Sequence, residues 1–272
     1  MDSVASNYVI RSRQNASVKA LRQAFANNGR IDDSRVAIEG EHLLEEAIRS
    51  GLIFEQVFVR EDSLPFFRSV WNARSRAAPP PLHVLAPDIF DGAVATEAPQ
   101  GIAAFVRMPI QSLGDVWSVP SPLLLVLEGI QDPGNLGTIL RAAEAFGTRA
   151  VFALPGTASP WNLKAVRASA GSVFRLPVFP TSLAGLAELQ NHNVRLCAAV
   201  ARDGATPEEI PWSSSIALCV GNEGRGLTKE LLSQATDRVT IRSSGAVESL
   251  NAAVAASILL YEAARHRATR QK

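Results

Sequence analysis

Five short and nearly uninterrupted apolar runs in the second half of the chain constrain its fold more than any other feature. These runs are 123–127, 150–154, 194–200, 216–220 and 238–241. The segments with helical periodicity that separate and follow them are 138–146, 162–170, 183–190, 228–234 and 248–266. Strands that are apolar along their whole length are typical of a parallel sheet with helices on both faces. We therefore predict an α/β domain over residues 123–272, built on five parallel strands.

The first part of the chain shows a shorter alternation of the same kind. Its predicted strands are 36–39, 57–60, 82–85 and 102–106, and its predicted helices are 18–26, 41–50, 64–75 and 88–93. This alternation predicts a smaller α/β domain over residues 1–107. Residues 108–122 contain three prolines and little periodicity, so we expect them to form a linker.

The composition is that of a globular chain, with 47% hydrophobic residues, 19% charged residues and a formal net charge of +1. Positive charge nevertheless gathers at both ends of the sequence. The basic residues of the ends are Arg11, Arg13, Lys19, Arg22, Arg30, Arg265, Arg267, Arg270 and Lys272. Basic ends suit contact with a polyanion, but solubilising termini are the simpler explanation from charge alone.

The two cysteines, Cys197 and Cys219, lie in apolar runs, and no cysteine or histidine pair has the spacing of metal ligands. We expect buried free thiols in a reducing compartment and no metal site. The N-terminus lacks an apolar signal core, and the longest apolar segment, 246–264, is interrupted by Glu248, Asn251 and Glu262. A buried helix is the better interpretation of that segment than a membrane span. A cytoplasmic protein without a membrane partner is expected.

Three polar segments follow three of the predicted strands. Four residues after 123–127 comes the sequence DPGNLG at 132–137, which has the composition of a turn, with a helix predicted from Thr138. After 216–220 comes GNEGRGL, and after 238–241 comes RSSGAVESLN. Because the carboxyl ends of parallel strands share one edge of a sheet, the three segments should meet there. The polar residues that they bring to this edge are Asn135, Arg141, Glu223, Ser249 and Asn251.

Each segment alone also has a purely structural explanation. DPGNLG can be only a turn, GNEGRGL can be a loop whose glycines relieve backbone strain, and Ser249 and Asn251 can be helix caps. The glycine spacing matches neither a dinucleotide fingerprint nor a phosphate-binding Walker loop. A ligand site explains the occurrence of all three polar segments at one edge of the sheet better than chance does.

The three segments resemble the three motifs of the SpoU family of RNA 2′-O-ribose methyltransferases, within the SPOUT superfamily. The first motif matches at Asn135, Gly137 and Arg141, and the second over 221–227. The third matches at Ile241 and 248–251, but Arg242 and Ser243 stand where the family usually has proline and an apolar residue. The segment from Lys164 to Gly171 is also similar to a family segment. Residues 12–22, 38–40 and 100–102 resemble the family's ribosomal-protein-like (L30e-like) substrate-binding domain.

This resemblance implies a C-terminal α/β domain threaded into a trefoil knot, S-adenosyl-L-methionine as cofactor, and a homodimer. By position, the cofactor would contact Gly221, Ile241 and Leu250, and the catalytic set would be Arg141, Asn135, Glu223, Ser249 and Asn251. Arg141 and Asn135 would serve a site completed by the partner subunit. The RNA contacts would come from Arg11, Arg13, Lys19, Arg22, Lys164 and Arg167.

Methylation of a ribose 2′-hydroxyl requires that the hydroxyl be deprotonated or polarised. The family assigns that task to the position of Arg141, but a guanidinium stays protonated in proteins. We therefore favour Arg141 as a residue that orients the ribose-phosphate and stabilises the developing alkoxide, with a true base role as the alternative.

The expected substrate is structured RNA, with 23S rRNA preferred over tRNA by family analogy. The other hypotheses are a non-catalytic RNA-binding or ribosome-associated factor of the same fold and a nucleotide-binding enzyme with an unknotted doubly wound fold.

Overall fold

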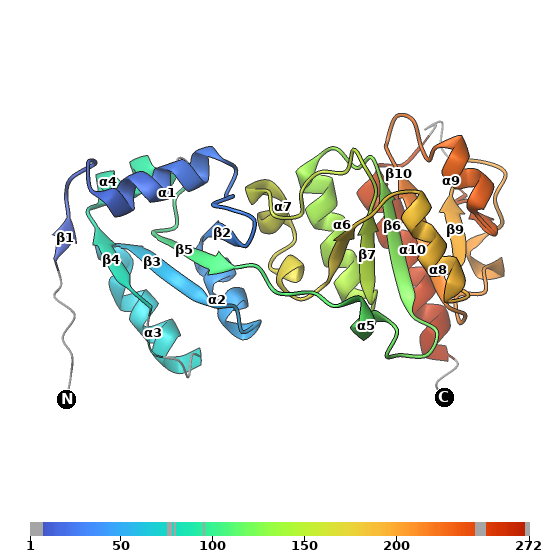
Figure 1. Cartoon of the computed structure of the whole chain (residues 1–272), viewed down its shortest axis with the longest axis horizontal. Helices are drawn as coiled ribbons and strands as arrows, with labels where there is room; N and C mark the ends of the chain where they lie inside the picture. The colour runs from blue at the N-terminus through green and yellow to red at the C-terminus, as the bar shows by residue number, and fades with distance from the viewer. Residues whose placement is uncertain (1–7, 75–77, 79, 95, 243–248, 270–272) are drawn as a thin grey trace. The chain divides into compact units, whose positions relative to one another are not determined.

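The computed structural model describes residues 8–74, 78, 80–94, 96–242 and 249–269. It divides into two compact units (Figure 1). The first comprises Met1–Pro109 together with Trp161–Phe174, and the second comprises Ile110–Pro160 together with Arg175–Lys272. The sequence prediction had placed a linker over 108–122, and the division in the structure follows Pro109. The predicted helix start at Glu248 and the motif departure at Ser243 lie outside the described residues.

The first unit is built on a mixed five-stranded sheet in the order β1-β4-β3-β5-β2. Its strands are β1 (Val9–Ile10), β2 (Arg35–Glu39), β3 (Phe54–Arg60), β4 (Leu82–Leu85) and β5 (Ile102–Arg107). Strand β5 runs antiparallel to β2 and β3, whereas β4 runs parallel to β1 and β3. Strand β1 is only two residues long, and no apolar run in the sequence predicted it.

Four helices cover the two faces of this sheet (Figure 1). They are α1 (Ala16–Ala26), α2 (Glu41–Arg49), α3 (Leu64–Arg74) and α4 (Pro87–Val94). Helix α1 packs on α4, and its buried residues Val18, Leu21 and Phe25 share a core with the sheet. The side chain of Asn15 caps α1 by accepting a hydrogen bond from the backbone N–H of Ser17 at 2.9 Å.

The segment Trp161–Phe174 belongs to the first unit, although in sequence it lies between two strands of the second unit. It contains α7 (Leu163–Ala168), and the N–H of Leu163 donates to the carbonyl of Asn28 at 3.1 Å. Arg167 forms an ion pair with Glu39, the last residue of β2. The sequence predicted this helix but not its membership of the first unit, because these contacts are remote in sequence.

The second unit contains a six-stranded sheet in the order β11-β9-β10-β6-β7-β8, and every pairing in it is parallel. Its strands are β6 (Leu123–Glu128), β7 (Ala150–Ala153), β8 (Val178–Pro180), β9 (Arg195–Ala199), β10 (Ile216–Gly221) and β11 (Asp237–Val239). The predicted parallel sheet is therefore confirmed, but the predicted number of five strands is wrong. Strand β8 escaped prediction because it has three residues, ends in proline and lies at the edge of the sheet.

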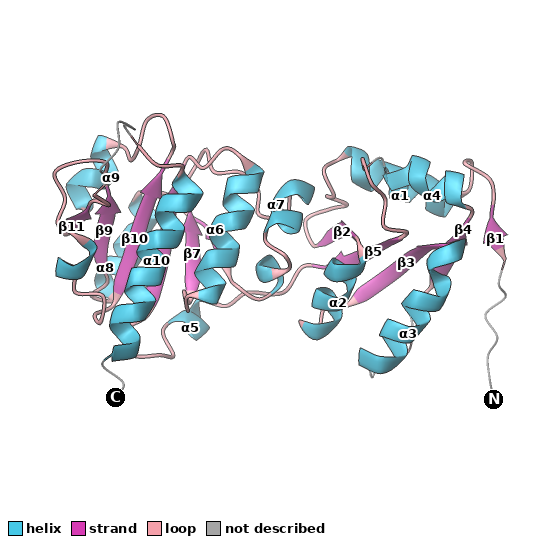
Figure 2. Cartoon of the chain, turned by 180° about the vertical axis from the view of Figure 1, so that it is seen from behind, coloured by secondary structure: helices cyan, strands magenta, loops and turns pink. Residues whose placement is uncertain are grey.

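Helices cover both faces of this parallel sheet, as predicted from its apolar strands. Helices α6 (Pro133–Ala145) and α10 (Ala252–Thr269) pack against each other in front of the sheet in Figure 2. The other face is covered by α5 (Leu113–Val116), α8 (Ala187–Asn191) and α9 (Lys229–Gln234). Arg267, near the end of α10, is half-buried and donates to the carbonyls of Ser121 and Ser214, so part of the basic C-terminal end has a structural task.

Both cysteines are buried in the second unit, as predicted. Burial raises the pKa of the Cys197 thiol to about 12 and also raises the pKa of Cys219. Within the described part of the chain, no helix combines the length and apolar character needed to cross a membrane. The same residues contain no group of three His, Cys, Asp or Glu side chains that could hold a metal ion.

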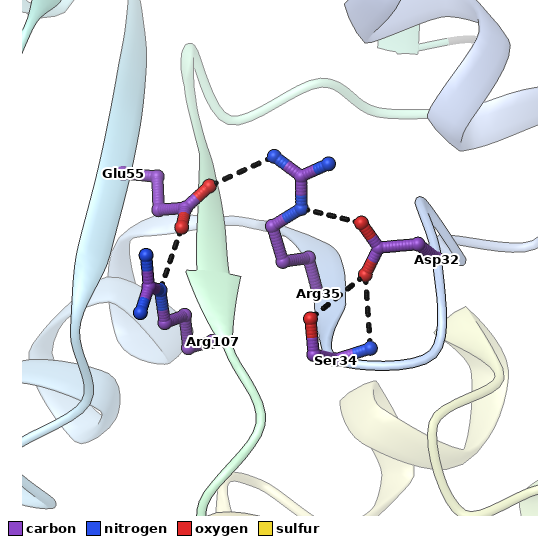
Figure 3. Close-up of polar contacts among 5 residues, drawn as sticks. All are labelled: Asp32, Ser34, Arg35, Glu55 and Arg107. Atoms are coloured by element: carbon purple, nitrogen blue, oxygen red, sulfur yellow. Dashed lines mark hydrogen bonds and ion pairs between the residues drawn. The ribbon is translucent and has the colours of Figure 1, made fainter.

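A network of ion pairs joins the ends of three strands in the first unit (Figure 3). Arg35 donates from Nε to Asp32 at 2.6 Å and from Nη1 to Glu55 at 3.0 Å, and Arg107 donates to Glu55 at 2.6 Å. Asp32 also accepts hydrogen bonds from the N–H and hydroxyl of Ser34. The Ser34 N–H, with help from Arg35, lowers the pKa of Asp32 from 3.8 to about 2.

Because the pKa of Asp32 is lower in the folded state, its carboxylate stabilises the fold above pH 3.8, and this contribution is lost as the pH falls through about 2. We expect Asp32→Asn to lower the melting temperature at pH 6, and the difference from the wild type to shrink as the pH falls toward 2. Thermal unfolding followed by circular dichroism at several pH values measures this effect.

Asp33→Asn is the matched control for this experiment, because Asp33 is almost fully exposed and pairs only with Arg30 among the described residues. It should leave the melting temperature nearly unchanged. Equal melting temperatures of wild type and Asp32→Asn at pH 6 would contradict the assigned role of Asp32.

Candidate functional site

A cavity of about 400 Å³ opens at the carboxyl edge of the second sheet. Residues 199–201, 220–226, Val239, Ile241, 249–250, Ala252, Ala255 and Leu259 line it. Its volume lies in the range of pockets that take small organic ligands. The lining includes all three residues that the resemblance assigns to the cofactor, Gly221, Ile241 and Leu250, together with Glu223 and Ser249.

The loop after β10 folds back on itself at this cavity. Asn222 Oδ1 accepts hydrogen bonds from the N–H groups of Gly224 at 2.9 Å and Arg225 at 3.2 Å. A Cβ atom at Gly221 would lie 2.3 Å from the carbonyl carbon of Gly226, so only glycine fits at position 221. Gly226 itself has a φ of +66°, which also favours glycine. The glycines therefore serve the loop's own backbone, a role that the sequence analysis had considered as the structural alternative.

Residues 133–137 are helical, so the prediction of 132–137 as a turn was wrong. Helix α6 begins at Pro133, and Asp132 caps it by accepting from the N–H groups of Gly134 and Asn135. Aspartate at the cap and proline at the first helical position are strong start signals, which a turn-like composition concealed. Asn135 thus lies in the first turn of a rigid helix rather than in a loop.

Asn135 joins the three polar segments to one another. Its Nδ2 donates to the carboxylate of Glu223, and its Oδ1 accepts from Nδ2 of Asn251 at 3.3 Å. Asn251 also caps α10, because its Oδ1 accepts from the N–H of Ala253 at 2.9 Å. The capping role considered for Asn251 and its place in the polar cluster therefore occur together. The structure brings three of the five catalytic candidates into direct contact within one chain.

Arg141 stands apart from this cluster. It lies on an exposed position of α6, and its guanidinium makes no hydrogen bond or ion pair with any other residue that the structure describes. It is also absent from the described lining of the cavity. Ser249 lines the cavity but is exposed. The site of a single chain therefore presents a fixed polar cluster and a separate guanidinium that has no partner among the described residues.

The cations expected to bind RNA fall into two groups. Arg11 lies 3.6 Å from Glu61, and Arg167 is paired with Glu39, whose side chain is only 2% exposed. In contrast, Arg13, Lys19 and Arg22 form no ion pair with another described residue. Lys164 is exposed at the start of α7, where its backbone N–H donates to Asn162.

Two polar residues close to the cavity were missed by the sequence analysis. Glu128 ends the buried strand β6 and accepts two hydrogen bonds from Thr228, each at 2.8 Å. The available signal in the sequence was a carboxylate placed directly after five apolar residues. Nearby, Asn222 Nδ2 donates to the carbonyl of Gly129 at 2.9 Å and ties the second polar segment to the first.

Comparison with known proteins finds two family models along the chain. Residues 122–261 match the SpoU rRNA Methylase family, and residues 15–104 match the MRM3-like substrate binding domain. The two matches correspond in order to the catalytic and substrate-binding parts expected from the motifs.

One similar protein, from Bacillus subtilis, is named a 23S rRNA (guanosine(2553)-2′-O)-methyltransferase, RlmP. It is 36% identical over 253 residues, which make up 93% of this chain and 97% of that protein. Among solved structures, an RNA 2′-O ribose methyltransferase superposes with a TM-score of 0.81 at 31% identity, covering 96% of this chain and 100% of its own.

A further solved structure, an AdoMet-bound rRNA methyltransferase from Sinorhizobium meliloti, has a TM-score of 0.81 at 26% identity and covers 95% of this chain and 98% of its own. The motifs, the parallel-sheet fold and these matches agree along nearly the whole chain. The chain belongs to the SpoU rRNA methylase family.

Proposed function

We propose that this protein transfers a methyl group from S-adenosyl-L-methionine to a ribose 2′-hydroxyl of ribosomal RNA. The observation that carries the proposal is the contact of Asn135 with both Glu223 and Asn251 beside a cavity of about 400 Å³. Support for the substrate and cofactor comes from the names of the relatives, which include a 23S rRNA 2′-O-methyltransferase and an AdoMet-bound rRNA methyltransferase. A large rRNA, the 23S molecule, is the expected target, and the protein would act in the cytoplasm.

The cavity suits the proposed cofactor. Val200, Ile241 and Leu250 offer apolar contacts for a nucleoside, and Glu223 and Ser249 offer polar atoms for its hydroxyl and amino groups. The cofactor supplies an electrophilic methyl group on a sulfonium ion. The task left to the protein is to place the ribose hydroxyl in line with that methyl group and to handle its proton.

Arg141 is the residue that we assign to the ribose hydroxyl. No histidine or lysine occurs among the described residues that line the cavity, so neither supplies a conventional base there. A protonated guanidinium orients the ribose-phosphate and stabilises the alkoxide as it forms. Asn135 is held by Glu223 and Asn251, and it lies on α6, the helix that also carries Arg141. These contacts therefore fix the position of the helix from which Arg141 projects.

We expect Arg141→Ala to lower turnover by about 10²–10³-fold or more, the usual cost of losing one transition-state contact. Its affinity for S-adenosyl-L-methionine should stay near the wild-type value, because Arg141 does not line the described cavity. Transfer of labelled methyl groups to total RNA, followed by mapping of the modified nucleotide, measures the first effect, and calorimetry measures the second.

Arg141→Lys separates the two roles of Arg141. Substantial turnover of this variant, with no ionisation attributable to residue 141 in the pH–rate profile, would support the electrostatic role and exclude the base role. If the wild-type protein labels no RNA, the proposed function is wrong. If the label is confined to tRNA, the protein is a tRNA methyltransferase and the proposed rRNA substrate is wrong.

We further propose that the protein acts as a homodimer, joined through α6 and α10. Helix α10 exposes Val254 (48%), Ile258 (37%) and Tyr261 (50%) at helical spacing, and Phe146 packs edge-to-face on Tyr261 with ring centroids 5.7 Å apart. An apolar stripe of this kind typically marks a protein interface. Arg141 is exposed on the adjacent helix α6, so the interface would bring it to the partner's cavity.

Subunit mixing tests whether Arg141 acts across that interface. Arg141→Ala and Gly221→Val should each be inactive alone, the latter because a side chain at position 221 meets the Gly226 backbone. After mixing and refolding, about a quarter of the wild-type rate should return, since random pairing makes half of the dimers mixed and each has one intact site.

Ile258→Asp supplies the complementary measurement. It should give monomers by light scattering and abolish turnover, whereas Lys229→Asp, a control at an exposed position of α9, should leave the dimer intact.

In the subunit-mixing experiment, mixed dimers of Arg141→Ala and Gly221→Val that form but stay inactive would show that each active site is built from one chain.

The first unit is proposed as the RNA-binding part, with Arg13, Lys19 and Arg22 as phosphate contacts. Many other arginines of this unit have their charge compensated by a nearby carboxylate. These three cations have no such partner among the described residues, so they keep their full attraction for RNA.

Lys19→Ala and Arg22→Ala should weaken RNA binding and reduce the slope of log affinity against log salt by about 0.7–0.9 each. Filter binding over a range of salt concentrations measures this slope. The control is Arg49→Ala, which removes an arginine that is already paired with Glu46. An unchanged slope for both α1 variants would place the RNA elsewhere.

A further inference from the structure

We infer that Glu128 and Thr228 are positioning residues that hold the cofactor-binding loop closed, an inference that rests on the proposed function. Neither residue belongs to the catalytic or cofactor set assigned above. The loop in question is residues 221–227, which supply much of the cavity lining, including Gly221 and Glu223.

Both ends of this loop meet at one residue, Glu128. In the pairing of β6 with β10, the backbone of Glu128 stands opposite Gly221, where the loop begins. The carboxylate of Glu128 accepts hydrogen bonds from the N–H and the hydroxyl of Thr228, each at 2.8 Å, where the loop has just ended. Glu128 thus fixes the start of the loop with its backbone and the end with its side chain.

The burial of Glu128 indicates that its carboxylate serves to hold Thr228. The residue is 8% exposed, and it forms no ion pair with another described residue. A buried carboxylate without a cation is costly, and here its two oxygens are satisfied by two donors of one threonine. An apolar residue at the end of β6 would fill the same space without that cost but could not hold Thr228.

The loop is also tied to the residue that follows Glu128. Asn222 Nδ2 donates to the carbonyl of Gly129 at 2.9 Å, and the Oδ1 of the same side chain orders the turn at Gly224. Glu223, the next residue, is the hydrogen-bond partner of Asn135. If the loop were released at Thr228, residues 221–226 would no longer be held in place as the lining of the cavity. Glu223 would then also no longer hold Asn135 in position.

A purely local role for Thr228 is the competing explanation. Its Oγ1 accepts from the N–H of Leu231 at 3.3 Å and so caps the short helix α9. A local cap would affect the stability of α9 but not the binding of the cofactor or the closure of the loop. The two roles therefore predict different measurements.

The experiment compares Thr228→Val, which removes the hydroxyl, with Thr228→Ser, which keeps it. Affinity for S-adenosyl-L-methionine is measured by calorimetry, and hydrogen exchange of residues 221–227 is measured in the cofactor-free protein. We expect Thr228→Val to weaken affinity about tenfold and to speed exchange in the loop, as expected for the loss of a hydrogen bond to a charged group. Thr228→Ser should restore both values to within about twofold.

Thr236→Val is the matched control. The hydroxyl of Thr236 likewise donates to a carboxylate, that of Asp237 at 2.8 Å, with the Leu196 carbonyl as a second acceptor at 3.2 Å, but it lies outside the described cavity lining. It should alter neither cofactor affinity nor exchange of the loop.

Wild-type affinity and wild-type loop exchange in Thr228→Val would overturn the inference and leave only the helix cap. If Thr228→Val does not fold, Glu128→Gln gives the second test, because the glutamine side chain has one acceptor oxygen where the glutamate has two. Unchanged cofactor affinity and unchanged loop exchange in Glu128→Gln would also overturn the inference. A wild-type protein that binds no S-adenosyl-L-methionine would instead contradict the proposed function, while exchange in the cofactor-free protein would still decide whether the loop is held.

Discussion

The parallel pairing of β6 with β10 at the centre of the second sheet is the constraint on which the site depends. Every residue of β6 is buried, and its pairing with β10 runs in register from Leu123 opposite Ile216 to Glu128 opposite Gly221. Because the two strands point the same way, the segments that follow them leave at one edge. A shift of register by one residue would turn Glu128 to the opposite face and separate its carboxylate from Thr228.

Polar side chains in the two units are used in different ways. In the second unit they tie backbone segments together, as Asp132 does at the start of α6 and Asn251 at the start of α10. In the first unit, arginines and carboxylates cancel one another in pairs and in the network of Figure 3. Against these compensated pairs, the cations at 13, 19 and 22 stand out, because they have no partner in the part of the chain that the structure describes.

Prediction from the sequence succeeded where periodicity and composition are local signals. Uninterrupted apolar runs identified the parallel strands, and capping side chains were correctly weighed for Asn251. It failed where one residue type has two meanings: the proline and glycines after Asp132 suggested a turn, although Asp132 and Pro133 start a helix. It also missed β8, which is too short to show a pattern. The knotted threading implied by the family resemblance stays a prediction.

Local patterns in the sequence are enough to establish the fold class, the order of the two α/β parts and the residues of the three polar segments, because each is encoded by neighbours in the chain. Folding in three dimensions is needed to bring Asn135 to Glu223 and Asn251 and to place Thr228 against Glu128. The packing of Trp161–Phe174 within the first unit likewise follows from tertiary contacts alone. Glu128 and Thr228 are a hundred residues apart in sequence. Contacts of that range depend on strand register and packing, and no local pattern in a single sequence specifies them.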